Sequence, residues 1–296
     1  MSLSVKHIFV IIPFWGLFSC SESGPNTMND IVEQDQSYIN SLDEVKNIFY
    51  MIPSPMETAI LVKKSGAEYD YRLLNAPNNV SKYDTKYKKA VNLGVYSADL
   101  SYATLYDQIQ DIRFYITSSK SLAEDLGVMK AFDQNMIDRV EYNLEDKDSM
   151  MSIVSDIYWI ADAHLKETDN VVVSSLMLYG GWIEAFYLAA NLYSVDIDNT
   201  ELRMRITEQK HSLDNLLSLL TKTAVIDEQI NDCIDHLKQL QELFNSFHLE
   251  EESPVLLDEK ENGINVIGGK SEITMTPKQF ESLFNLVKEI RSKNIS

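Results

Sequence analysis

The chain has 296 residues, with 26 basic and 45 acidic side chains and a formal net charge of −19. A field of this sign repels nucleic acid and anionic lipid head groups, so we expect neither as a partner. The chain has two cysteines, Cys20 and Cys233, and Cys233 falls on an apolar helical stripe, where a core residue is expected. The length is ample for one large helical domain or two smaller ones.

Residues 1–19 have the three-part layout of a secretory signal. Lys6 supplies the short basic start, an apolar run over residues 8–18 follows, and Ser19 precedes the expected cut. The apolar run covers only about 11 residues, whereas a bilayer-spanning helix needs about 20. We therefore do not expect this segment to be a permanent transmembrane anchor.

The end of this signal, Leu17-Phe18-Ser19-Cys20, resembles the lipobox of bacterial lipoproteins. The resemblance implies that the signal is cut before Cys20 and that Cys20 carries the lipids that hold the protein on the membrane. It also implies the outer membrane, because Ser21 rather than Asp follows the cysteine, and it leaves the periplasmic or surface face open. The alternative is a buried cysteine near an apolar N-terminus. Residues 20–27 have the polar, Gly- and Pro-containing composition of a flexible tether.

From residue 28 to residue 250 the apolar positions recur mainly at helical spacing, which predicts an all-α multi-helix array or bundle, repeat-like or irregular. A helix is expected to begin at Ser54-Pro55, with Glu57 in its first turn, and to stop near Gly66. Residues 67–80 carry the turn residues of a loop. The other expected helices cover residues 28–50, 82–118, 119–126, 129–145, 148–168, 171–193, 198–222 and 225–249.

The segment over residues 171–193 is apolar on nearly all sides and is long enough to span a membrane. Glu184 lies inside it, however, and Asp169 and Asp196 flank it. Because a charge is costly in lipid, we expect this segment to be a buried central helix of the array.

After Glu250 the pattern changes. Two short β-like runs flank Asn262-Gly263, a dipeptide typical of a tight hairpin, with an ordered loop as the alternative. Thr276, Pro277 and Gln279 then favour the start of a final helix. The sequence thus predicts a helical domain over residues 28–250, and a small β-hairpin plus C-terminal helix over residues 251–296 packed on it.

Two segments combine small and polar residues in a helical setting. In the first, Ala90, Gly94 and Ala98 align on one helix face, where small side chains let another helix approach closely. In the second, Gly180-Gly181 lies inside an apolar helix, where each glycine costs about 1 kcal/mol relative to Ala. Such a cost indicates close backbone approach, a kink or room for a ligand. When the two segments are aligned with each other, Gly94 matches Gly180. A duplicated helical unit would explain this match, and the question stays open.

These segments predict a ligand-binding site in which carboxylates and aromatic walls suit a cationic or sugar-like ligand. Its candidate residues are Asn92, Tyr96, Asp99, Tyr102, Trp182 and Glu184. The alternative is that the glycines serve packing and that the carboxylates are capped or salt-bridged at a helix interface. An enzyme that uses Asp99 and Glu184 as paired carboxylates would need them about 5–10 Å apart in an open cleft.

The run Ile52-Pro53-Ser54-Pro55, the stretch from Asn92 to Tyr102 and the run from Gly180 to Glu184 together resemble a group of all-helical lipoproteins of Gram-negative envelopes. The resemblance covers residues 50–192. It implies an envelope location and a helical fold, and it brings no activity and no catalytic residue.

Metal and nucleophile motifs are weak or lacking. His164 and Glu167 share one helix face, but no matching partner motif accompanies them, and no phosphate-binding loop, dinucleotide fingerprint or nucleophile elbow occurs. We therefore expect no metal and no cofactor. The favoured hypothesis is a non-catalytic, lipid-anchored envelope protein that binds a small molecule or a partner protein, with an enzyme or an envelope-assembly scaffold as the alternatives.

Overall fold

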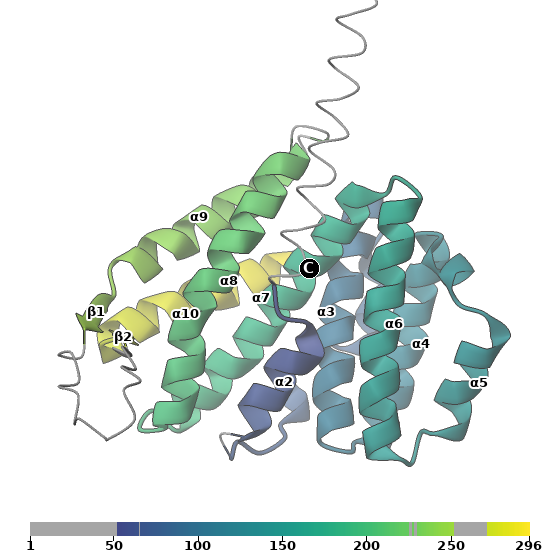
Figure 1. The fold of residues 1–296 in the computed structure, drawn as a ribbon, viewed down its shortest axis with the longest axis horizontal. Helices are drawn as coiled ribbons and strands as arrows, with labels where there is room; N and C mark the ends of the chain where they lie inside the picture. Colours follow the sequence, from purple (N-terminus) through teal and green to yellow (C-terminus); the bar gives the residue numbers. More distant parts are fainter. Residues whose placement is uncertain (1–51, 65, 225–226, 228–229, 252–270) are drawn as a thin grey trace, which may run out of the picture. The chain divides into compact units, whose positions relative to one another are not determined.

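Helices make up most of the part of the chain that the computed structural model describes, which is residues 52–64, 66–224, 227, 230–251 and 271–296. The predicted signal, tether and first helix, residues 1–50, lie outside it. Within the described residues the all-α array is confirmed (Figure 1). The helices are α2 (Pro55–Lys64), α3 (Lys86–Leu105), α4 (Ile109–Asp125), α5 (Gln134–Tyr142), α6 (Lys147–Glu167), α7 (Val171–Val195), α8 (Thr200–Ala224), α9 (Asn231–Asn245) and α10 (Pro277–Asn294), with 3-10 turns η1 (Tyr71–Leu73), η2 (Pro77–Lys82) and η3 (Val128–Ala131).

Two helices begin where the sequence predicts, and both use reciprocal caps. At α2 the Glu57 N–H donates to Ser54 Oγ (3.2 Å) and the Ser54 N–H donates to the Glu57 carboxylate (2.6 Å). At α10 the side chains of Thr276 and Gln279 do the same. Each pair satisfies two amides that a helix start would otherwise leave unpaired, which is why these short motifs are informative.

The single helix predicted over residues 82–118 is wrong. The chain ends α3 at Leu105, turns, and begins α4 at Ile109. Asp107 has a φ of 59°, a left-handed conformation that Asp tolerates better than most residues. The turn contains neither Gly nor Pro, so the apolar spacing runs through it without a visible break.

Helix α7 is the centre of the array. It packs against α2, α3, α6, α8 and α10, and Figure 1 shows α8, α9 and α10 to one side of it and α3 to α6 to the other. Among the described helices it alone is long and apolar enough to cross a membrane by length and composition, yet 94% of its most apolar window is buried inside the fold. The predicted buried central helix is therefore confirmed.

Helices α3 and α7 cross with their backbones in contact. A Cβ atom added at Gly94 would lie 1.9 Å from the Met177 carbonyl oxygen, and one at Gly180 would lie 1.9 Å from the Val91 carbonyl oxygen. This confirms the close backbone approach that the small residues predict. The contacts are reciprocal, so the two aligned glycines have equivalent environments, while the duplication itself stays a prediction.

Two short strands precede the last helix. Strands β1 (His248–Glu251) and β2 (Ser271–Thr274) pair antiparallel over their four residues. The hairpin predicted around Asn262-Gly263 falls in residues 252–270, outside the described residues, and stays a prediction.

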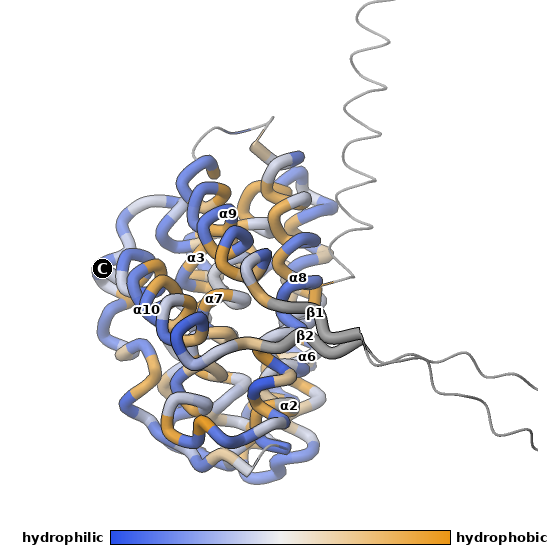
Figure 2. The backbone as a smooth tube through the Cα atoms, turned by 90° about the vertical axis from the view of Figure 1, so that its left-hand side faces the viewer, coloured by the Kyte–Doolittle hydropathy of each residue, from blue (hydrophilic) through white to orange (hydrophobic). Residues whose placement is uncertain are grey.

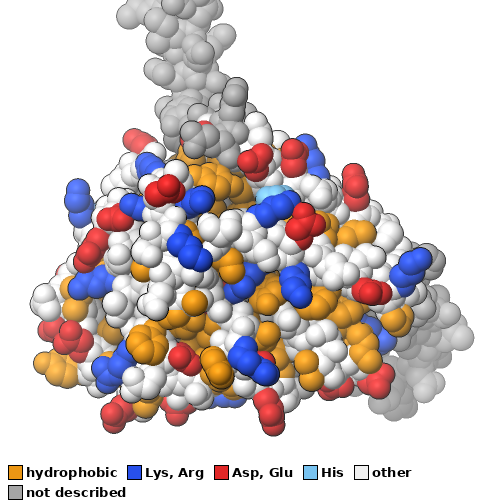
Figure 3. All heavy atoms as spheres, turned by 180° about the vertical axis from the view of Figure 1, so that it is seen from behind, with side chains coloured by type: hydrophobic (Ala, Val, Ile, Leu, Met, Phe, Trp, Pro, Cys, Tyr) orange, Lys and Arg blue, Asp and Glu red, His pale blue; other side chains and the backbone are white. Residues whose placement is uncertain are grey.

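The outer helices are amphipathic. Hydrophobic and hydrophilic residues alternate along α8, α9 and α10, with Cys233 of α9 buried in the core as expected (Figure 2). On the face seen from behind, acidic and basic side chains are interspersed with small hydrophobic areas (Figure 3). The negative charge therefore does not gather into one acidic patch on that face.

Candidate functional site

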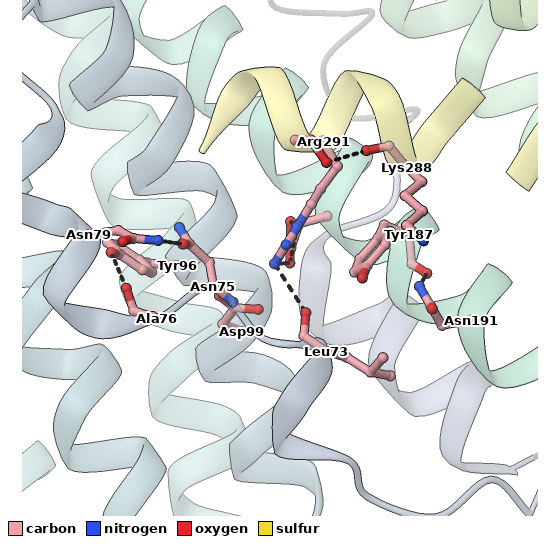
Figure 4. A network of polar contacts seen from close by, with 12 residues as sticks. Leu73, Asn75, Ala76, Asn79, Tyr96, Asp99, Tyr187, Asn191, Lys288 and Arg291 are labelled. Carbon is pink, nitrogen blue, oxygen red and sulfur yellow. Dashed lines mark hydrogen bonds and ion pairs between the residues drawn. The ribbon is translucent and has the colours of Figure 1, made fainter. Parts of the chain in front are cut away.

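The fold brings the two predicted carboxylates together. Asp99 of α3 and Glu184 of α7 are both 0% exposed. Arg291, from α10, reaches Glu184 with two nitrogens: Nε donates to Oε2 (2.9 Å) and Nη2 donates to Oε1 (2.8 Å). Nη2 also donates to the Leu73 carbonyl (3.0 Å), and the guanidinium lies 4.6 Å from the centroid of the Tyr187 ring (Figure 4). The pair is thus a bidentate, buried ion pair that joins three separate parts of the chain.

Asp99 is the member of this cluster whose surroundings favour the protonated form. Its Oδ2 accepts the Asn75 N–H (3.1 Å), whereas its buried Oδ1 has no other partner. Burial raises the pKa of Asp99 well above its ordinary value, and the neighbouring Glu184 charge raises it further, against the opposing effect of Arg291. A proton on Asp99 also lets the two carboxyl groups share a hydrogen bond, which two ionised carboxylates cannot do. One guanidinium then balances one carboxylate.

The two tyrosines predicted to form aromatic walls of a ligand site bind backbone carbonyl groups instead. The Tyr96 hydroxyl donates to the Ala76 carbonyl (3.1 Å), and the Tyr102 hydroxyl donates to the Glu68 carbonyl (3.2 Å). These bonds fasten the segment between α2 and α3 onto α3. The two tyrosines therefore act as fasteners of an irregular segment that has few backbone bonds of its own.

The remaining two candidates, Asn92 and Trp182, form hydrogen bonds with groups other than the two carboxylates. The Asn92 amide donates to the Asn294 carbonyl at the end of α10 (2.8 Å). The Trp182 indole donates to Ser212 Oγ of α8 (2.9 Å). All six predicted residues are buried, so the geometry favours the packing alternative at this cluster over a ligand site.

Sequence reasoning missed Arg291, the residue that organises the cluster. A signal was present, because Arg291 continues the helical spacing of Phe284 and Val287 and so places a charge on an otherwise apolar face. A cation at such a position predicts a buried carboxylate partner, although the spacing does not say which one.

A cavity of about 400 Å³ lies elsewhere in the fold, lined mainly by α3, α4, α5 and α6, with further residues from α2, α7 and η3. Apolar side chains dominate its wall, among them Leu93, Leu100, Ile116, Val128, Met129, Phe132, Met136, Ile137, Val140 and Val154. Exposed Lys120 and Glu141 also line it, so the cavity reaches the surface. None of the six predicted site residues lines it.

Helix α5 forms the outer wall of this cavity. Its apolar residues Met136, Ile137 and Val140 are only half-buried, and no residue of α5 is fully buried. Arg139 Nη2 pairs with Asp156 Oδ2 of α6 at 3.0 Å, with both side chains partly exposed. Because α5 buries so little surface, moving it away from the fold costs less free energy than separating α3 from α7.

Tyr158 of α6 and Ser119 of α4 also line the cavity. Their hydroxyl oxygens are themselves buried, and neither has a hydrogen-bond partner among the described residues. No sequence pattern indicates this cavity, because it depends on how side chains from several helices fill the space between them.

No family model matches the chain, and no curated protein or solved structure matches it either. Among the described residues, no group of three or more His, Cys, Asp or Glu side chains is placed to hold a metal ion.

Proposed function

We propose that this chain is a lipid-anchored protein of the bacterial envelope, held at the outer membrane through Cys20, whose helical domain binds a small apolar molecule without chemical change. The observation that carries the proposal is the cavity of about 400 Å³. Ligand pockets have volumes of about 300–1,000 Å³ and combine mainly hydrophobic walls with a few polar groups. The cavity agrees with this description in size and in lining.

An empty cavity lowers the stability of a folded protein. Protein interiors are close-packed, and mutational series give a loss of about 24 cal/mol per Å³ of residual cavity. Water gains few hydrogen bonds from an apolar wall, so it fills such a space poorly. An apolar ligand supplies the missing contacts and offsets the cost.

A carboxylate-dependent enzyme is the weaker candidate. Two-carboxylate chemistry needs both groups in a cleft that admits substrate. Asp99 and Glu184 are instead 0% exposed, and Arg291 occupies the carboxylate of Glu184. The envelope-assembly scaffold stays a hypothesis, with no contact of the described residues in its favour.

Filling the cavity should abolish binding. Ala161 of α6 lines the cavity and is 6% exposed, so the Ala161→Phe ring should occupy ligand space. We expect the mature chain from residue 20, with Ser in place of Cys20, to bind the hydrocarbon probe diphenylhexatriene saturably, and Ala161→Phe to weaken this binding by at least about tenfold. Fluorescence titration measures both.

Ala163→Phe is the matched control, because Ala163 is exposed on the same helix and does not line the cavity. It should leave the titration unchanged. Probe fluorescence that never saturates, or that both variants change equally, would contradict binding in this cavity.

Replacing Cys20 with Ser should release the protein from membranes. The apolar run before Cys20 is about 11 residues long, too short to span, and the acidic domain offers no attraction to anionic lipid. Membrane fractionation with a salt wash, together with labelled palmitate incorporation, measures the effect. Cys233→Ser, at a buried cysteine, should stay membrane-bound and labelled. A Cys20→Ser protein that remains in the membrane fraction would overturn the anchor.

A further inference from the structure

The residues that line the cavity change in character from one end to the other. Leu93 and Leu100, on the central helix α3, line it and are each only 5% exposed. Thr117 and Lys120 of α4 and Glu141 of α5 line the same cavity and are exposed, and Figure 1 shows α5 at the outer edge of this group of helices. The cavity therefore has an enclosed, apolar inner end at α3 and a polar mouth at α4 and α5.

The fold does not use the two charged groups at the mouth. Arg139 of α5 pairs with Asp156 of α6 at 3.0 Å. In contrast, neither the Lys120 ammonium nor the Glu141 carboxylate forms an ion pair with any residue that the structure describes. Both charges are in contact with water, so a polar head group of a ligand can lie beside them without losing its hydration.

The inner end, by contrast, offers no donor to a second polar group. Ser97 and Ser101 are the serines that α3 contributes to the wall. Ser97 Oγ donates to the Leu93 carbonyl (2.7 Å), and Ser101 Oγ donates to the Ser97 carbonyl (2.8 Å). Because both hydroxyl hydrogens are used within the helix, a carboxylate placed at this end would lose its water and gain no hydrogen bond from them.

The wall between the two ends is flexible and mostly aliphatic. Two of the lining residues are aromatic, Phe132 and Tyr158, whereas four are methionines: Met56, Met129, Met136 and Met177. Aromatic faces favour stacking with flat rings, whereas the unbranched methionine side chain adjusts to an irregular or mobile neighbour. A wall of this kind suits a narrow, flexible chain better than a broad ring system.

Resting on the proposed function, we infer that the ligand is a single-chain amphiphile. Its alkyl chain runs inward to Leu93 and Leu100, and its polar head group stays in water at the mouth, near Lys120 and Glu141. Each methylene group that enters the cavity adds to the affinity, while the head group avoids the cost of desolvation. The ligand therefore has one apolar end and one polar end, and the site admits it in one direction.

The test compares laurate with dodecanedioate, which has the same chain length and a carboxylate at both ends. Both compete with diphenylhexatriene for the mature chain bearing Cys20→Ser, at concentrations below those at which they form micelles. Laurate should displace the probe, and dodecanedioate should bind at least about 100-fold more weakly, because its second carboxylate must enter the inner end. From octanoate to decanoate to laurate the affinity should rise about fourfold for each methylene group.

Two variants test the two ends separately. Leu100→Ala creates room at the inner end, so the preferred chain length should shift toward longer acids. Leu202→Ala, at a residue 1% exposed that does not line the cavity, controls for lost stability and should leave the preferred length unchanged. Lys120→Met should weaken laurate by about threefold, as expected for an exposed charge, and Lys130→Met, at an exposed lysine outside the lining, should not.

The outcomes separate this inference from the function on which it rests. If dodecanedioate displaced the bound probe as well as laurate does, both ends of the ligand would lie in water, and the inference would be overturned while the apolar site remained. A saturably bound probe that laurate does not displace would have the same meaning, as would a preferred chain length that Leu100→Ala leaves unchanged. A probe that does not bind at all would instead overturn the proposed function.

Discussion

Replacing Arg291 by methionine should lower the free energy of unfolding by about 3–5 kcal/mol, the usual cost of removing one partner of a buried ion pair. The Arg291 side chain is 11% exposed and Glu184 is 0% exposed, so the variant leaves a carboxylate without solvent or cation. The Leu73 carbonyl also loses its donor. Urea unfolding of the two purified proteins measures the deficit.

Lys293→Met is the matched control on the same helix. Lys293 Nζ pairs with Glu289 at 2.8 Å, but both side chains are more than half exposed, and such a surface pair contributes little to stability. The double variant Glu184→Gln, Arg291→Met removes both charges and should recover much of the lost stability. An Arg291→Met protein no less stable than Lys293→Met would contradict the role assigned to the ion pair.

The neighbouring Asp99→Asn variant should behave differently, because it replaces a carboxyl group whose pKa is raised by burial with a neutral group of similar shape. The raised pKa means that folded Asp99 holds its proton to higher pH than unfolded Asp99 does. The unfolding free energy of the native chain therefore falls as the pH rises above about 4, and the variant lacks this contribution. From that pH upward the stability difference should shift in favour of the variant. Parallel pH profiles of the two proteins would contradict a protonated Asp99.

Gly94→Ala should destabilise the fold by about 3 kcal/mol or more, at the upper end of the cost of overpacking. Its Cβ would lie 1.9 Å from the Met177 carbonyl oxygen and 2.6 Å from the Gly181 amide nitrogen, both of them backbone atoms. Backbone has no rotamer to change, so α3 and α7 must move apart along the centre of the molecule. Gly180→Ala, 1.9 Å from the Val91 carbonyl oxygen, should have a similar effect. Chemical unfolding of the purified variants measures it.

Gly181→Ala separates the crossing from helix propensity. Its Cβ would meet the Gly94 carbonyl oxygen and Pro55 Cγ at 3.3 Å, which a shift of a few tenths of an ångström relieves. Ala also favours the helix by about 1 kcal/mol over Gly, so the net change should be small. If Gly94→Ala and Gly181→Ala had equal effects, the two helices would not touch as described.

The sequence predicts those parts of the fold that depend on local chemistry. The caps at Ser54 and Thr276 are visible because each needs only a hydroxyl and a carboxyl or amide three residues apart. The turn at Asp107 is not visible, because it depends on a left-handed residue that is neither Gly nor Pro. Local signals therefore identify helix starts better than the break between α3 and α4.

The residues of the candidate site are likewise only partly predictable from the sequence. The sequence identifies Asp99 and Glu184 as unusual, because carboxylates beside glycines on apolar helices need a partner. It does not indicate that the partner is Arg291, which lies 107 residues beyond Glu184. With Arg291 as the partner of Glu184, the cluster is an internal ion pair instead of the predicted site for a cationic ligand.

What the sequence by itself determines is the all-α class, the buried character of α7 and the small-residue helix face that includes Gly94, since these follow from residue type and spacing along one helix. Only the tertiary structure decides that Arg291 neutralises Glu184, that burial beside Glu184 raises the pKa of Asp99, and that a cavity opens beneath α5. Each of these depends on groups from separate helices that meet in space. Periodicity within one helix carries no information about which of them meet, or about the space left where none does.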